Sequence, residues 1–419
     1  MFRPREIVCL STTLNILRAY QVFPRKGEEL NPGFSFYVKY VIGCLLASVI
    51  LVGSFLHLVH TVRTKQYNNI DVDLSYVLSM TSGFLLFILF SANTTAASKM
   101  YMFLSDFEQF GKPPKFDRYN RFLTKAGKSH FIYLGVIITL FALSSNIFKG
   151  AQCRRDNLEY EYKEICGLIT NTWLPFEIDY FPVKEIYLCL QCFSIYYVYM
   201  LSGSITFMVM ESVVHIGIRL DHVRQLFVDA LNDTNMEDRR KKFNFAVRYH
   251  SRVLELEHGL NTCFSNAMFS HMVLTASIIG CTGFGVMQSG SPNALAVCIG
   301  WLNGMSFVCL SGQHLTNKSL EVGLAVYDTK WYDIEPALQR DLSIVLMRCQ
   351  KAMILRAAGF GVMNHATILA SIIQTNEVIN AWDRDGRDMV GISLNIVRGE
   401  TPGADYIVIS NIFELGRFI

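Results

Sequence analysis

The chain has 419 residues, of which 51% are hydrophobic, 13% aromatic and only 17% charged, and its formal net charge at pH 7 is +3. With a mean hydropathy of +0.28, this composition is too apolar for an ordinary soluble enzyme. It fits a polytopic membrane protein with sizeable polar segments.

Seven stretches of the chain approach the roughly 20 apolar residues that a helix needs to cross a bilayer. They cover residues 40–60, 74–97, 131–148, 186–210, 264–287, 295–313 and, more weakly, 357–373. We therefore predict an all-α membrane protein with seven transmembrane helices.

Basic residues are unevenly distributed between these stretches. If the amino terminus is cytoplasmic, 27 of the 38 Lys and Arg residues fall on the cytoplasmic side, in segments 1–39, 98–130, 211–263 and 314–356. Cytoplasmic loops are enriched in Lys and Arg, so we expect a cytoplasmic amino terminus and an external carboxyl terminus.

The apolar residues 7–17 are interrupted by polar ones and lack a cleavage pattern, so we expect no cleavable signal peptide.

The first stretch carries His57 and His60, one helical turn apart, which is a spacing that can present two metal ligands on one face. No third ligand accompanies them, and polar-tipped residues at the end of a span are usually interfacial. We therefore expect no metal site and no cofactor.

The longest external loop joins the third and fourth stretches and contains Cys153 and Cys166. An oxidising compartment permits a disulfide between them, and two free thiols remain the alternative. Aromatic residues and prolines over 173–182 favour an ordered lid over a loose tether. The fourth stretch then continues without a stop signal through Leu220, which predicts one long helix that projects into the cytoplasm.

Residues 314–356 combine many polar residues with apolar ones at helical spacing on both sides of Pro336. This pattern predicts two amphipathic helices that are interrupted near Pro336. Their apolar faces require a partner, and the same elements of neighbouring subunits are the nearest candidates. The residues assigned to assembly are Tyr327, Trp331, Tyr332 and Leu342.

Several of these residues also carry a resemblance to a known family. The spaced residues Cys309, Gly312, Leu315, Ser319, Tyr327 and Trp331-Tyr332 resemble the insect odorant receptor family. Segments 173–191 and 249–265 look like the family's approaches to its fourth and fifth spans. The resemblance covers most of residues 170–375 and, more diffusely, 30–170.

This resemblance implies an odorant-tuned subunit of a ligand-gated, nonselective cation channel. Family members assemble as heterotetramers with a common co-receptor subunit in the plasma membrane of sensory neurons, as multi-pass proteins. Their last span lines the pore, and the corresponding residues here are Thr367, Ser371 and Thr375. The expected partners are therefore the co-receptor, a small volatile organic ligand and membrane lipid, with no nucleic acid.

The family's ligand pocket lies in the outer halves of these spans, where apolar and aromatic walls with a few hydroxyls bind mainly by shape. For each single candidate here, ordinary helix packing remains the alternative. The candidates for ligand contact are Tyr76, Met80, Phe84, Phe87, Phe141, Ser144, Ser145, Phe148, Cys192, Tyr196, Met200, Ile279, Gly283 and Val286.

The resemblance stops after Thr375, where polar and charged residues follow in place of the family's apolar helix ending. We therefore divide the chain into spans one to six with the pocket (1–313), anchor helices (314–356), the start of the pore-lining helix (357–375) and a divergent tail without expected structure (376–419). An altered final exon accounts for this tail most simply, and it predicts little gated current from the chain.

Three other classes of protein fit the sequence less well. A related gustatory receptor lacks support because this chain does not have the carboxyl-terminal ending that is usual in that family. A G-protein-coupled receptor has a topology opposite to the one that the basic residues predict here. A transporter is disfavoured because no span carries a paired acid and base near its middle. No enzyme is expected, since the glycine-rich residues 280–285 lie inside a span, where they suit helix packing better than phosphate binding.

Overall fold

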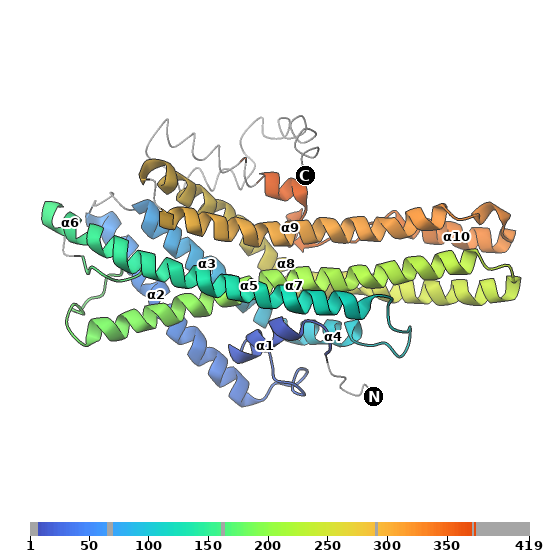
Figure 1. The fold of residues 1–419 in the computed structure, drawn as a ribbon, viewed down its shortest axis with the longest axis horizontal. Coiled ribbons are helices and arrows are strands. Elements are labelled where there is room, and N and C mark those ends of the chain that lie inside the picture. Colours follow the sequence, from blue (N-terminus) through green and yellow to red (C-terminus); the bar gives the residue numbers. More distant parts are fainter. Residues whose placement is uncertain (1–6, 65–69, 161–163, 290–291, 371–372, 374–419) are drawn as a thin grey trace.

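The computed structural model describes residues 7–64, 70–160, 164–289, 292–370 and 373, which form an elongated helical bundle (Figure 1). In chain order its elements are α1 (Ser11–Ala19), α2 (Phe34–Thr64), α3 (Ile70–Ser91), α4 (Thr94–Leu104), α5 (Phe116–Ser144), a π-helical turn (Ser145–Lys149), α6 (Gly150–Tyr160), α7 (Val183–Leu231), α8 (Met236–Ser289), α9 (Pro292–Tyr327), a 3-10 turn (Trp331–Asp333), α10 (Pro336–Cys349), β1 (Arg356–Ala357) and β2 (Gly361–Val362).

Six of these helices, α2, α3, α5, α7, α8 and α9, are long and apolar enough to cross a membrane. They coincide with the first six predicted spans, and the all-α fold is confirmed. One boundary differs, because the second span was expected to continue to Ala97. Instead α3 ends at Ser91, and α4 begins as a separate helix at Thr94.

The long central helix is also confirmed. Between Val183 and Leu231, α7 has 49 residues and no proline, so nothing interrupts its hydrogen-bond ladder. At 1.5 Å per residue its length is about 74 Å, more than twice the roughly 30 Å core of a bilayer. Its residues Val198, Leu201 and Ile205 are completely buried, because α2, α3, α5, α8 and α9 all pack against it.

Prolines and side-chain caps set the ends of the neighbouring helices. Asn235 caps α8 by accepting a hydrogen bond from the Glu237 amide at 3.0 Å. Pro292 and Pro336 open α9 and α10, the position at which a missing amide hydrogen costs least. α7, α8 and α9 extend together to the end of the bundle where α10 packs against α9, at the right of Figure 1. We call this the α10 end.

The expected last helix starts later than Ala357. Residues 356–357 and 361–362 form an antiparallel pair, and helical residues begin at His365. Asn364 caps that helix, since its side-chain oxygen accepts a hydrogen bond from the Thr367 amide at 3.0 Å. The apolar run 357–363 therefore forms a hairpin and not the first turns of a span. The divergent tail, 376–419, lies outside the described residues.

The segment from Met353 to Met363, which we call the linker hairpin, is tied to both α8 and α9. Asn261 on α8 donates to the Ile354 carbonyl at 2.9 Å and accepts from the Arg356 amide at 2.7 Å. Ser319 on α9 accepts from the Met353 amide at 3.0 Å. These contacts satisfy backbone groups that a short hairpin leaves unpaired.

Candidate ligand-binding cavity

An apolar cavity of about 120 Å³ lies between α5, α7, α8 and α9. Its lining residues are Leu134, Ile137, Ile138, Phe141, Tyr199, Ser202, Gly203, Thr206, His271, Ala296, Val297, Gly300, Trp301 and Gly304. A dry cavity of about 150 Å³ in another protein holds benzene, so this space suits a molecule of about one ring.

Aromatic rings and short polar side chains make up the wall of the cavity. The rings of Tyr199 and Trp301 are 6.4 Å apart, and Trp301 also lies 5.6 Å from the His271 ring. The hydroxyls of Ser202 and Thr206 donate to carbonyls of their own helix, at 3.1 and 3.0 Å. These two hydroxyl protons are therefore used within α7, and the wall binds chiefly through apolar contact.

Two glycines shape this space in different ways. A Cβ atom at Gly203 would lie 2.5 Å from Leu134 Cδ1, so the Leu134 side chain would have to shift to admit a larger residue between α7 and α5. A Cβ atom at Gly300 would meet nothing within 4 Å. Larger side chains at Gly300 therefore have room to enter the cavity.

A second, groove-like space of about 290 Å³ adjoins the cavity between α5 and α9. It shares Leu134, Gly203 and Gly300 with the cavity and adds Tyr133 and Asn303. The Asn303 side-chain amide donates to the Tyr133 hydroxyl at 3.5 Å.

Among the expected ligand contacts whose side chains the structure describes, only Phe141 lines the cavity. Tyr76 packs against the Phe141 ring at 5.9 Å, on the side of α3. Met80, Phe84 and Phe87 are buried in the core that α3 forms with α7, and the Phe87 ring contacts Tyr197. These side chains therefore pack inside the bundle.

The remaining expected contacts lie on other surfaces of the same helices. Ser144 donates to the Phe141 carbonyl, and Ser145 is buried at the π-helical turn. The Tyr196 hydroxyl pairs with that of Thr139 on α5. Ile279 is buried, Cys192, Met200, Gly283 and Val286 are half-buried, and the Phe148 side chain lies outside the described part of the chain.

Sequence reasoning missed Tyr199, His271 and Trp301, which contribute the polar and aromatic part of the wall. A usable signal was present for His271, since an ionisable residue inside an apolar span is a functional candidate by default. Trp301 sits between Gly300 and Gly304 on α9, where two small residues leave a hollow beside a large ring.

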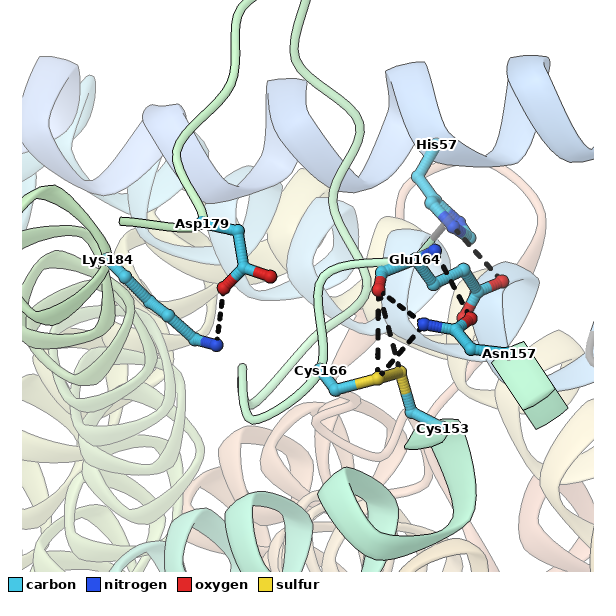
Figure 2. Close-up of a disulfide and its surroundings, with 7 residues drawn as sticks. All are labelled: His57, Cys153, Asn157, Glu164, Cys166, Asp179 and Lys184. Atoms are coloured by element: carbon cyan, nitrogen blue, oxygen red, sulfur yellow. Dashed lines mark hydrogen bonds and ion pairs between the residues drawn. A yellow bond between two sulfur atoms is a disulfide. The ribbon is translucent and has the colours of Figure 1, made fainter. Parts of the chain in front are cut away.

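At the opposite end from α10, the loop before α7 and the end of α2 enclose a polar pocket of about 880 Å³. Cys153 and Cys166 form a disulfide that holds the loop to α6. Figure 2 shows Asn157 beside this disulfide, where it donates to the Glu164 carbonyl at 2.8 Å. The Glu164 carboxylate is thereby placed 3.8 Å from His57 Nε2.

Both histidines expected at this end have protein partners. His57 Nδ1 lies 2.8 Å from Asp73 on α3, and the His60 ring stacks on Trp173 at 5.3 Å. Within the described ranges, no group of three His, Cys, Asp or Glu side chains is arranged to hold a metal ion. The loop itself is ordered by hydrogen bonds, such as that from the Ile169 amide to the Gln191 side chain at 2.8 Å.

The residues assigned to assembly divide into two groups. Tyr327 and Tyr332 are 61% and 62% exposed, and Trp331 is half-buried between them with ring centroids 6.1 Å from each. Leu342 differs, because it is 1% exposed and packs inside the subunit. On α10 the exposed apolar side chains are Ile344 and Met347.

Of the three residues assigned to the pore, the structure describes only Thr367. Its hydroxyl donates to the Val362 carbonyl at 2.5 Å, which ties the helix start to the linker hairpin. Ser371 and Thr375 lie outside the described residues.

The fold and cavity together define a polytopic helical membrane protein with an apolar space between its helices. The sequence model of the family described as "7tm Odorant receptor" matches residues 74–374. The chain therefore belongs to the odorant receptor family.

Individual relatives agree with this assignment. The chain is 27% identical to odorant receptor 47b of Drosophila melanogaster over 140 residues, which are 31% of this chain and 34% of the relative. It is 25% identical to the odorant receptor coreceptor of Harpegnathos saltator over 142 residues, 32% of this chain and 30% of the relative. Each match thus spans about a third of the curated relative.

The fold is similar to the solved structure of the insect olfactory receptor OR5 from Machilis hrabei in complex with eugenol. The TM-score is 0.70 at 12% sequence identity, with 92% of this chain and 96% of that chain covered. The likeness extends over nearly the whole of both chains, although so few residues are shared.

Proposed function

We propose that this chain is the odorant-tuned subunit of a ligand-gated, nonselective cation channel that binds small volatile organic molecules in the cavity between α5, α7, α8 and α9. The observation that supports this most directly is the cavity itself, which is apolar, aromatic and of about one-ring size. The family match favours this function over the gustatory receptor and the G-protein-coupled receptor.

The subunit acts with a co-receptor in a heterotetramer in the plasma membrane of sensory neurons. Three curated relatives are themselves coreceptors, which indicates that ligand-tuned and common subunits share one fold. We place the amino terminus in the cytoplasm, as the distribution of basic residues indicates, and the α10 end then lies inside the cell. The exposed apolar residues of α9 and α10 would meet neighbouring subunits there.

Ligand binding opens such a channel only if the open state binds ligand more tightly than the closed state. The cavity is walled by α8 and α9, and the same two helices hold the linker hairpin that precedes the last helix. A ligand that shifts either helix would therefore displace the start of the pore-lining segment.

The test fills the cavity without disturbing the backbone. Gly300→Phe adds a ring where a Cβ atom meets nothing within 4 Å, so the variant should fold and lose ligand responses by at least about tenfold in potency. The measurement is current evoked by a panel of volatile compounds in cells that express the chain with the co-receptor.

Gly135→Phe is the matched control, because Gly135 also has open space around its Cβ position but does not line the cavity. It should keep the response profile. Equal sensitivity of both variants, or unchanged responses of Gly300→Phe, would place the ligand elsewhere. Since the tail departs from the family pattern, ligand-induced thermal stabilisation of the full chain serves as a second readout that needs no gating.

A further inference from the structure

One nitrogen in the wall of the cavity has no partner of its own. His271 is 1% exposed, and its Nδ1 lies 3.1 Å from the hydroxyl of Thr275, one turn along α8. The other ring nitrogen, Nε2, is buried and has no hydrogen-bond partner within the described part of the chain. Burying a polar atom in this way costs free energy unless the atom gains a hydrogen-bond partner.

The position of Nε2 indicates where such a hydrogen-bond partner could lie. It lies beside Gly304 on α9, where an added Cβ atom would come within 3.6 Å of it. From α9 the nitrogen meets the backbone of Gly304, which has no side chain, and this contact does not satisfy it within the described part of the chain. The cavity that His271 and Gly304 both line is adjacent.

The other groups in the wall set the rest of the chemistry. Among the described residues no Asp, Glu, Lys or Arg side chain lines the cavity, so a charged ligand would lose its hydration without gaining an ion pair from them. The hydroxyl protons of Ser202 and Thr206 are held by carbonyls of α7. This leaves the imidazole and the Tyr199 hydroxyl, which also lacks a partner among the described residues, as side chains that could fix the orientation of a ligand.

We propose that Nε2 of His271 makes a hydrogen bond to a single oxygen function of the ligand, and that the cavity therefore selects neutral molecules of about one ring that carry one hydroxyl or carbonyl group. This inference rests on the proposed function, since it assumes that the cavity is the ligand site. A hydroxyl group suits either tautomer of His271, because it donates to a bare Nε2 and accepts from a protonated one.

The experiment compares three probes of one skeleton, namely benzyl alcohol, benzaldehyde and toluene. Their dissociation constants are measured by ligand-induced thermal stabilisation of the full chain. The informative quantity is the ratio of toluene to benzyl alcohol affinity, since differences in hydration between the probes cancel when variants are compared.

His271→Phe keeps a planar ring and removes both nitrogens. This substitution should weaken the binding of benzyl alcohol relative to that of toluene by about tenfold, the factor expected for one lost hydrogen bond in a dry site. His222→Phe is the matched control, because the His222 ring also contacts an aromatic ring, that of Tyr249, but lines neither the cavity nor the adjoining groove, and its ratio should stay at the wild-type value. If His271→Phe does not fold, His271→Leu tests the same ratio.

The two proposals fail in different ways. If neither toluene nor benzyl alcohol stabilises the wild-type chain, the cavity is not a ligand site and the proposed function falls. If both bind and Gly300→Phe blocks both, but the ratio is unchanged in the His271 variant that folds, only the assignment of His271 is overturned.

Discussion

A single buried arginine joins three helices at one point of the bundle. Arg219 on α7 is 2% exposed, and its guanidinium donates to the carbonyls of Phe103, Leu104 and Asp106 at 2.9–3.1 Å. It also donates to the Tyr249 hydroxyl on α8 at 3.2 Å. The Phe103 and Leu104 carbonyls lie at the end of α4, where no further helical turn donates amide hydrogens to them. A fixed, always charged fork of donors serves all of these acceptors at once.

We predict that Arg219→Ala destabilises the protein by about 3 kcal/mol or more, because several buried acceptors lose their donor together. Thermal unfolding of the purified chain measures this effect. Arg240→Ala is the control, since Arg240 makes only an exposed ion pair with Asp341, worth at most about 1 kcal/mol. A similar small change in both variants would mean that water replaces the guanidinium.

At the residue scale, sequence pattern identified which side chains are apolar but not which neighbours they meet. Phe84 and Phe87 have the helical spacing of a pocket wall, yet both are buried in the core of the bundle. A spacing of three and four residues defines one face of a helix, and long-range packing decides what covers that face. The sequence shows that His271 is a polar residue inside an apolar span. It does not show that Nε2 lies beside Gly304, because this contact joins two different helices.

The linker hairpin is the element that sequence reasoning described least well. Apolar residues over 357–363 have the pattern of the start of a span, but the polar side chains that hold the hairpin lie 34 and 95 residues from their backbone partners, on α9 and α8. Local composition cannot reveal such distant partners. The long helix α7 was predictable because its continuity depends only on its own sequence, which lacks proline.

We predict that Gly312→Ala displaces the linker hairpin from α9. A Cβ atom at Gly312 would lie 1.9 Å from the carbonyl oxygen of Met363, and a backbone atom cannot move away as a flexible side chain does. Overpacking of this kind costs about 1–3 kcal/mol. The expected result is faster proteolysis or hydrogen exchange over residues 353–363.

Gly300→Ala on the same helix is the control, because its added methyl group meets open space. Both substitutions exchange glycine for alanine within α9, so the gain in helix propensity is the same and cancels. Equal protection of residues 353–363 in the two variants would show that the hairpin does not depend on close contact at Gly312.

Over the whole molecule, α8 and α9 connect the cavity with the linker hairpin. On α8, His271 and Asn261 are ten residues apart, or about 15 Å along the axis, and they contact the cavity and the linker hairpin respectively. α9 repeats this arrangement with Gly304 and Gly312 and then continues to the α10 end. A displacement of either helix at the cavity would therefore also move the hairpin that the same helix holds.

The α10 end carries exposed apolar side chains that the described part of the chain does not cover. Its members are Leu324, Tyr327, Tyr332, Ile344 and Met347, each at least 61% exposed. Apolar surface of this kind on a polar segment marks an interaction site, and the same elements of neighbouring subunits suit it best. Leu342, on the inner side of α10, holds the helix to its own subunit instead.

We predict that the double variant Tyr327→Ser, Met347→Ser lowers co-purification of the chain with its co-receptor by about tenfold or more, since two apolar side chains no longer desolvate at the interface. The melting temperature of the isolated chain should stay within a few degrees of wild type, because both residues are exposed in the subunit.

Tyr180→Ser removes an equally exposed aromatic ring at the opposite end of the bundle and should leave co-purification unchanged. If it weakens assembly as much as the double variant does, the interface is not confined to the α10 end. Normal assembly of the double variant would show that other surfaces join the subunits.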